Sequence, residues 1–178
     1  VPKIAGKTKI DLIKNTGAEL TIVEGAYANA LIAAEKFEQE TGAMQVHAFD
    51  SVETTCGQGT LMHEWEQQGL EADTILIAVG GGGLIAGVAT YLKTISPKIK
   101  IIGVEPTGAN AMAQSLDRGE IIRLSKVDGF ADGVAVKEVG VNCFQICQQS
   151  VDGVMMVRTD QTCAALKDVF EDTRSILE

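Results

Sequence analysis

The sequence predicts an α/β fold, a twisted and mostly parallel sheet with helices on both faces. Short apolar stretches of strand length alternate along the 178 residues with segments whose apolar residues recur at helical spacing. Residues 74–79 form an unbroken apolar run, which is typical of a strand buried on both faces of a parallel sheet. The repeated alternation of strand and helix implies parallel layers joined by right-handed crossovers.

The first part of the chain contains three predicted helices and two predicted strands. In order, these are a helix at 7–16, a strand at 19–23, a helix at 27–40, a weaker strand at 44–47 and a helix at 59–68. The helices carry apolar residues at helical spacing, such as Ala30 and Ala34 in the second. Each is followed closely by a glycine (Gly17, Gly42 or Gly69), a residue that commonly ends helices.

The second part continues the same alternation. In order, we predict a strand at 74–79, a helix at 84–94, a strand at 99–104, helices near 109–118 and 139–149, a strand at 153–157 and a last helix from 160 to 178. We expect the apolar face of the last helix (Cys163, Leu166, Val169 and Phe170) to be core, with part of it exposed if the domain is incomplete. Residues 119–137 show little periodicity, and long loops of this kind inside compact domains are often functional.

Composition and charge exclude several classes of protein. The chain has 15 Lys and Arg against 24 Asp and Glu, a net charge of −9, which argues against a nucleic-acid partner. Its longest apolar stretch is too short to cross a bilayer, so no membrane partner is expected. Four cysteines do not make a disulfide scaffold in a chain of this size, which favours a reducing, cytoplasmic location.

The strongest candidate for a binding site is the run Gly80, Gly81, Gly82, Gly83, between the strand at 74–79 and the helix beginning near Leu84. Backbone without side chains lets several N–H groups turn toward one point, and a helix N-terminus adds partial positive charge. This arrangement binds anions, phosphate above all. A tight strand-to-helix turn alone would need one or two glycines, so four in a row favour a phosphate site.

The residues alone leave the identity of the phosphate ligand open. Residues 81–86 fit the dinucleotide pattern G-x-G-x-x-A, and Glu105 ends the next strand, where it could bind a ribose hydroxyl. Two interpretations of the glycine run therefore stay open. It belongs either to a nicotinamide- or flavin-binding oxidoreductase domain or to a site for a smaller phosphorylated cofactor.

Three motifs in order carry a resemblance to a known family. They are Gly57-Gln58-Gly59-Thr60, the glycine run with Leu84, and Phe130-Ala131-Asp132-Gly133-Val134-Ala135-Val136. Together they resemble the threonine/serine dehydratase family of fold-type-II pyridoxal-phosphate enzymes, with serine racemase a close relative. The resemblance covers nearly the whole chain. It implies a fold like that of the tryptophan synthase β-subunit, incomplete in this chain, with residues 1–45 in the smaller domain and 46–178 in the larger, cofactor-binding domain.

The resemblance also implies roles for particular residues. Residues expected to bind pyridoxal 5′-phosphate are Gly80, Gly81, Gly82, Gly83 and Leu84 at its phosphate, Phe49 near the edge of its ring, and Gly133 and Val134 on the face where substrate docks. Residues 57–60 are expected to open a helix beside the site. The parent enzyme would convert L-threonine or L-serine to a 2-oxo acid and ammonia, and it would form a homo-oligomer. Membership of the biosynthetic branch would place it in isoleucine biosynthesis.

No catalytic residue is expected within the chain. The Schiff-base lysine of this family lies in a Ser-x-Lys-x-Arg-Gly-type motif that no lysine here matches, so we expect it upstream of Val1. On this interpretation the chain is an interior segment that holds the cofactor phosphate and is inactive alone. The other class of function is a non-catalytic domain that binds a phosphorylated ligand.

Other polar residues are assigned structural roles. In serine-racemase-like relatives the glutamate matching Glu105 helps to hold a divalent cation, but Ala111 stands where a second ligand would be, so no metal site is expected. Cys143 and Cys147 lie on one helix face without further zinc ligands nearby, and we expect buried thiols. His47 and His63 lack the partners of a hydrolase site.

Overall fold

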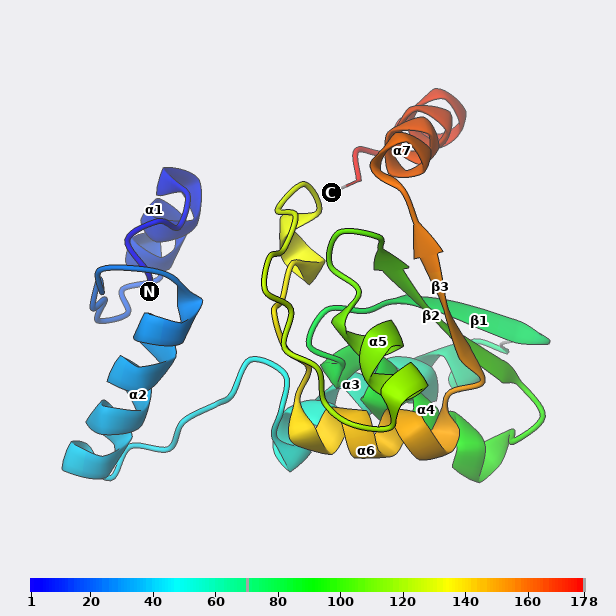
Figure 1. Cartoon of the computed structure of the whole chain (residues 1–178), viewed down its shortest axis with the longest axis horizontal. Helices are drawn as coiled ribbons and strands as arrows, with labels where there is room; N and C mark the ends of the chain where they lie inside the picture. The colour runs from blue at the N-terminus through cyan, green and yellow to red at the C-terminus, as the bar shows by residue number, and fades with distance from the viewer. Residues whose placement is uncertain (70, 178) are drawn as a thin grey trace. The chain divides into compact units, whose positions relative to one another are not determined.

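The computed structural model describes residues 1–69 and 71–177 (Figure 1). The chain divides into two compact units, Val1–Val46 and His47–Glu178. The first unit contains helices α1 (Lys7–Asn15) and α2 (Tyr27–Thr41), close to the two predicted there. Gly42 caps α2 in the left-handed conformation at φ +72°, which glycine adopts without steric cost.

The predicted strands at 19–23 and 44–47 are wrong. In the first segment Val23 accepts a hydrogen bond from the Lys3 amide and donates one to the Val1 carbonyl oxygen, and the Thr21 carbonyl oxygen accepts one from the Val1 ammonium group. These contacts make an isolated bridge between Pro2 and Val23 rather than a ladder. Residues 44–47 form no ladder with any described residue. A strand is stabilised by pairing with a neighbour, so apolar sequence without an adjacent strand leaves only extended chain.

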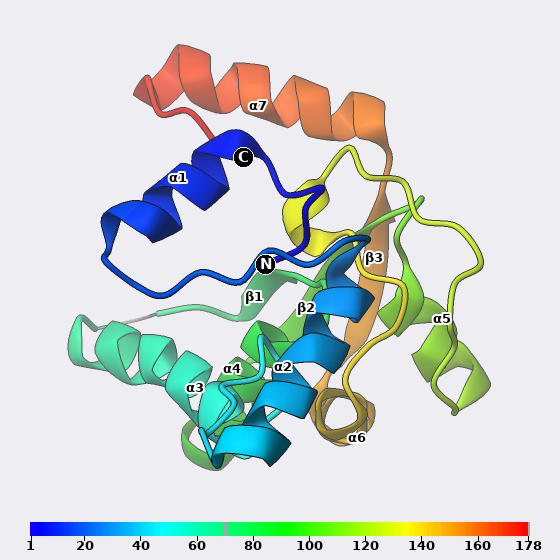
Figure 2. The same ribbon diagram turned by 90° about the vertical axis from the view of Figure 1, so that its left-hand side faces the viewer.

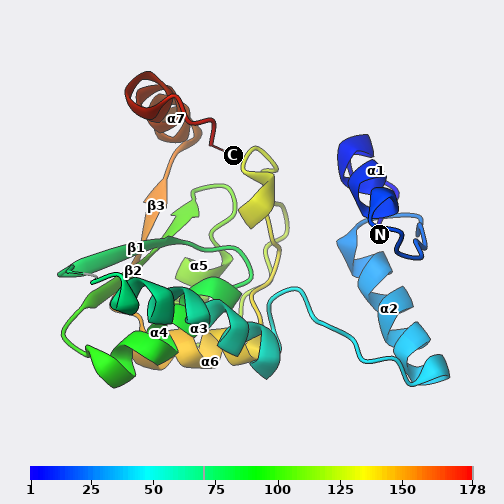
Figure 3. The same ribbon diagram turned by 180° about the vertical axis from the view of Figure 1, so that it is seen from behind.

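The second unit is built on a parallel sheet, as predicted, and its strands lie in the order β1-β2-β3. Its strands are β1 (Thr74–Ala78), β2 (Lys100–Pro106) and β3 (Gly153–Val157). Ile75 pairs with Ile101, and Gly103 pairs with Val154. Helices connect the parallel strands, and Figures 2 and 3 show the sheet from two further sides.

Five α-helices and one short 3-10 helix complete the described part of this unit. They are α3 (Val52–Gln67), α4 (Gly83–Ile95), α5 (Ala111–Arg118), the 3-10 helix (Asp132–Val134), α6 (Val141–Ser150) and α7 (Thr159–Thr173). Helices α3, α4 and α6 lie on one side of the sheet (Figure 3). Between them and the sheet, Ile77, Ile85, Val88 and Phe144 join the buried core.

The opposite face of the sheet is largely uncovered by the described residues. Leu76 and Met155 on that face are 63% and 48% exposed, so the prediction that the strand at 74–79 is buried on both faces is wrong. The predicted α/β class with a parallel sheet is confirmed, and helices α3, α4 and α6 cover one face of that sheet. Helix α7 ends at Thr173, before Arg174 at φ +60° and short of the predicted end at 178, and it exposes Phe170 and Cys163, as expected for part of its apolar face in an incomplete domain. Within residues 1–69 and 71–177 no helix is long and apolar enough to cross a membrane.

Helix α3 begins seven residues before the predicted start at 59. The Ser51 hydroxyl accepts a hydrogen bond from the Thr54 amide, which caps the helix there. Residues 57–60 therefore lie inside α3, and the expectation that they open a helix is wrong. Gly59 serves packing instead, because a Cβ there would lie 3.1 Å from the Gly87 carbonyl oxygen of α4.

Two helix glycines, Gly87 at the α3–α4 contact and the exposed Gly57 in α3, should respond in opposite ways to alanine. A methyl group at Gly87 would overlap the Thr55 carbonyl oxygen, whereas Gly57 has open space around its Cβ position. We expect Gly87→Ala to destabilise the protein by about 2 kcal/mol and Gly57→Ala to stabilise it by about 0.5 kcal/mol. Urea unfolding measures both, and equal effects of the two variants would contradict this packing.

Asp152, the residue before β3, is hydrogen-bonded through its carboxylate to β2 and α4. It accepts hydrogen bonds from the Ile101 amide at 2.8 Å and from the Lys93 ammonium at 3.0 Å. These two donors, the amide first, lower the pKa of Asp152 from its ordinary value. A lowered pKa stabilises the folded state above the unfolded value, and that stabilisation is lost as the pH falls through the folded value.

Asp152→Asn should therefore lower the free energy of unfolding by about 1 kcal/mol at pH 7, a modest effect because the side chain is partly exposed. The difference from wild type should shrink below about pH 4, near the ordinary pKa of an aspartate. Urea unfolding at pH 7 and pH 3 measures this. A difference that does not change between the two would contradict the role of the ionised carboxylate.

Candidate cofactor site

The candidate site lies where β1 passes into α4, at the carboxyl end of a parallel strand. The chain continues past β1 to the buried Val79, whose amide donates to the Val104 carbonyl oxygen at 2.9 Å. Gly82 then caps α4 at φ +99°, a conformation that strains any other residue. The first main-chain bond of α4 joins the Ala86 amide to the Gly82 carbonyl oxygen.

The amides of residues 80–85 lack a protein acceptor. In the described part of the chain no oxygen accepts a hydrogen bond from any of them, although Gly81, Gly82 and Gly83 are buried. Buried amides without partners are costly and rare in native proteins. A row of them at a helix N-terminus fits an anionic ligand, and the site suits a phosphate group.

Each glycine of the run is also required by close neighbours. A Cβ at Gly80 would lie 3.1 Å from the Val134 Cα, and one at Gly81 would overlap the Phe49 ring. One at Gly82 would lie 2.8 Å from both the Cys143 Cβ and the Met112 methyl group, and one at Gly83 would lie 2.9 Å from the Phe49 carbonyl oxygen. Packing alone thus accounts for all four glycines, more than the one or two expected for a tight turn. The unpaired amides are the observation that indicates a ligand.

The structure brings most of the predicted site residues together. Phe49 lies against Gly81 and Gly83, with its ring edge-on to that of His47 at 4.9 Å. Val134 and the Gly133 carbonyl, in the 3-10 helix, lie against Gly80. The half-buried Leu84 packs on the core at the first turn of α4.

Sequence reasoning missed three residues that contact the glycine run. The Met112 methyl group and the Cys143 Cβ flank Gly82, and the Gly140 amide donates to the Gly81 carbonyl oxygen at 3.0 Å. They come from α5, α6 and the residue before α6, which are distant in sequence. No motif marks them, because tertiary packing alone brings them to the glycine run.

Glu105 caps a helix from inside the fold. It is fully buried, and its two carboxylate oxygens accept hydrogen bonds from the Met112 and Ala113 amides of α5 at 2.9 and 2.8 Å. Burial raises the pKa of Glu105, and the two amide bonds oppose that rise. Its carboxylate is thus neither placed for a ribose hydroxyl nor free for a cation. Among the described residues, no group of three His, Cys, Asp or Glu could hold a metal ion.

The histidines and buried cysteines have structural partners. His47 Nδ1 accepts hydrogen bonds from the amides of the turn that follows it, and His63 Nδ1 lies 2.8 Å from the Tyr91 hydroxyl. Burial raises the pKa of both Cys143 and Cys147 to about 12. Both thiols are buried, as predicted, and both stay protonated at neutral pH.

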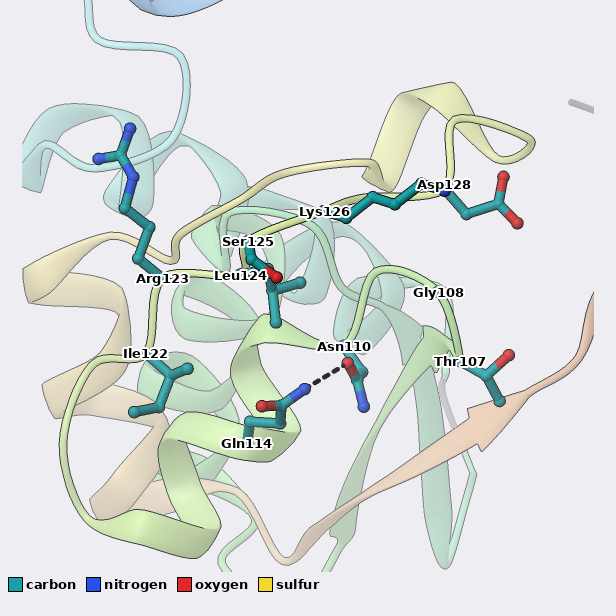
Figure 4. Close-up of a pocket in the computed structure, with 10 residues that line it drawn as sticks. All are labelled: Thr107, Gly108, Asn110, Gln114, Ile122, Arg123, Leu124, Ser125, Lys126 and Asp128. Atoms are coloured by element: carbon teal, nitrogen blue, oxygen red, sulfur yellow. Dashed lines mark hydrogen bonds between the residues drawn. The ribbon is translucent and has the colours of Figure 1, made fainter.

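A shallow polar hollow of about 500 Å³ lies beside the loop that follows β2 (Figure 4). It is lined by Thr107, Gly108, Asn110, Gln114, Ile122, Arg123, Leu124, Ser125, Lys126 and Asp128. Gln114 donates a hydrogen bond to Asn110 across it at 2.9 Å, while Arg123 extends away from this pair. The residues expected to bind the cofactor are not among those that line this hollow.

The whole chain, residues 1–178, matches the family described as pyridoxal-phosphate dependent enzyme. The chain belongs to this family. The cofactor that names the family is the one predicted from the sequence, and a phosphate group on that cofactor suits the unpaired amides of residues 80–85.

Relatives of known name agree with this assignment. The biosynthetic, chloroplastic threonine dehydratase of Arabidopsis thaliana is 45% identical over 179 residues, covering 100% of this chain and 30% of that protein. The processed form of threonine deaminase isoform 2 from Solanum lycopersicum superposes with a TM-score of 0.94 at 42% identity, covering 99% of this chain and 52% of that chain. Serine racemase from Dictyostelium discoideum superposes with a TM-score of 0.89 at 32% identity, covering 100% of this chain and 57% of that one. The resemblance to fold-type-II enzymes of this kind is thus confirmed, and the chain spans about a third to a half of these relatives.

The burial of two cysteines predicts selective alkylation. At pH 8 iodoacetamide should modify the exposed Cys56 and Cys163 in the native protein and leave Cys143 and Cys147 unmodified, because only thiolates react and burial holds those two thiols protonated. Mass spectrometry of peptides after timed labelling measures this, with the denatured protein as the control. Native labelling of Cys143 as fast as Cys56 would contradict the packing around Gly82.

Proposed function

We propose that this chain holds the 5′-phosphate of pyridoxal phosphate in an enzyme that deaminates L-threonine or L-serine to a 2-oxo acid and ammonia. The observation that carries the proposal is the row of unpaired amides at residues 80–85, buried at a helix N-terminus in a member of this cofactor's family. The threonine dehydratases and threonine deaminase that resemble the chain support this reaction class.

The chain's own residues bind and orient the cofactor in this proposal. The amides of residues 80–85 donate to the phosphate oxygens, and the dipole of α4 favours its negative charge. Phe49 and Val134 flank the glycine run and would border the bound cofactor, together with Gly133. When bound, pyridoxal phosphate withdraws electrons from the substrate's α-carbon, so that the α-proton can leave. The lysine that anchors it would be supplied by the segment before Val1.

The structure does not support the dinucleotide alternative, because the acidic residue expected to bind the ribose is engaged elsewhere. A ribose hydroxyl would need Glu105, whose two oxygens already accept hydrogen bonds from α5 in a fully buried position. What remains of the pattern is a glycine run, which any phosphorylated cofactor could use. The observations therefore favour pyridoxal phosphate.

Three finer features belong to the same proposal. The full protein would act in the cytoplasm, although relatives such as the Arabidopsis protein are named as chloroplastic. It would form a homo-oligomer. The relatives named as biosynthetic support a place in isoleucine biosynthesis.

The test uses the full-length protein that contains this chain. We expect pyridoxal phosphate to bind about 100-fold more tightly than pyridoxal, because two charge-assisted hydrogen bonds to the phosphate are together worth about 3 kcal/mol. Equilibrium dialysis measures both dissociation constants. We also expect L-threonine to give 2-oxobutanoate and L-serine to give pyruvate, each with ammonia.

NAD serves as the competing ligand in the same experiment. Tight binding of NAD together with equal affinities for pyridoxal and its phosphate would contradict the proposal. Preferential binding of the phosphate form without release of any 2-oxo acid would support the non-catalytic alternative instead.

A further inference from the structure

Asp50 reaches across the fold to the N-terminus of α6. Its Oδ2 accepts a hydrogen bond from the Val141 amide at 2.8 Å, and its Oδ1 accepts from the Asn142 and Cys143 amides at 2.9 and 3.2 Å. These are the first amides of the helix, which have no partner within it. A carboxylate is the group best suited to this position, because its charge also complements the helix dipole.

The residue before α6 connects this cap to the glycine run. Gly140 is buried, and its amide donates to the Gly81 carbonyl oxygen at 3.0 Å. In a trans peptide the carbonyl of one residue and the amide of the next point in opposite directions. Holding the Gly81 carbonyl toward Gly140 therefore turns the Gly82 amide away from α6.

The segment that carries Asp50 is itself in contact with the same glycines. The Asp50 amide donates to His47 Nδ1 at 2.8 Å, which holds the turn, and the Cys143 thiol donates to the Phe49 carbonyl oxygen at 3.2 Å. Phe49 lies against Gly81 and Gly83. Phe49 and Asp50, adjacent in the chain, thus each contact α6, and Phe49 also lies against the glycine run.

The fit at this junction leaves no room for a side chain at position 140. A Cβ on Gly140 would overlap the Asp50 carboxyl group, although the φ of Gly140, −67°, suits any residue. The glycine at 140 is therefore required by the approach of Asp50. This gives a second, independent way to disturb the contact without changing its charge.

We propose that Asp50 is a positioning residue for the cofactor phosphate, acting through the N-terminus of α6 and Gly140 to set the direction of the Gly82 amide. The inference rests on the proposed function. Asp50 touches no reacting group in this scheme, and its effect reaches the phosphate only through the Gly81–Gly82 peptide.

The test compares affinities for pyridoxal phosphate and pyridoxal in the full-length protein. Asp50→Asn places an NH2 group against the Val141 amide, and Gly140→Ala displaces the carboxylate while keeping its charge. We expect each variant to reduce the preference for the phosphate form about tenfold, with the affinity for pyridoxal unchanged. The 31P chemical shift of bound pyridoxal phosphate should move as well. Asp152→Asn is the matched control, since Asp152 also accepts a main-chain hydrogen bond but does so at the start of β3.

The outcomes separate this inference from the function on which it rests. A wild-type protein with no preference for the phosphate form would overturn both. A wild-type preference that survives in Asp50→Asn and Gly140→Ala, with only a lower unfolding midpoint, would make Asp50 purely structural and overturn the inference alone. A preference for the phosphate form that falls about tenfold in both variants but not in Asp152→Asn is the expected result. If Asp50→Asn does not fold, Gly140→Ala decides the question with the same readout.

Discussion

The candidate site of the second unit depends on the close approach of several segments to one glycine run, residues 80–83. Phe49 lies where side chains at Gly81 and Gly83 would be, and Val134 lies where one at Gly80 would be. These contacts leave only backbone groups for the run to present, and among the described residues its amides are the groups without a protein partner. The same packing that excludes side chains therefore creates the phosphate site, and the requirement for glycine follows from both.

Two buried or partly buried carboxylates then determine where the surrounding helices begin. Glu105 of β2 caps α5, the next helix along the chain, and Asp50 caps α6 from a distant part of the chain. Both helices lack a side-chain cap of their own. In the sequence Glu105 resembles a metal or ribose ligand. In the structure both of its carboxylate oxygens accept hydrogen bonds from α5 amides instead. The negative charges stabilise helix N-termini around the site without reaching a ligand.

The accuracy of the sequence predictions depends on how local the determining interaction is. Helices α2 and α4 and the strands β2 and β3 were predicted within a few residues, because helical periodicity, glycine caps and apolar runs are local signals. The strand predicted at 19–23 failed because a strand also needs a partner. The start of α3 was missed because its glycines suggested a helix boundary, while in the structure Gly59 permits contact with Gly87.

The sequence by itself determined the order of helices and strands in the second unit, the parallel α/β class and the position of a glycine run between a strand and a helix. These follow from residue periodicity and backbone freedom, which act over a few neighbouring residues. The tertiary structure alone decided which groups surround that run and which polar atoms remain unpaired. Gly140 and Cys143 contact the run although they are far from it in the chain, and Asp50 reaches it only through them, so only the folded arrangement of helices brings these residues together.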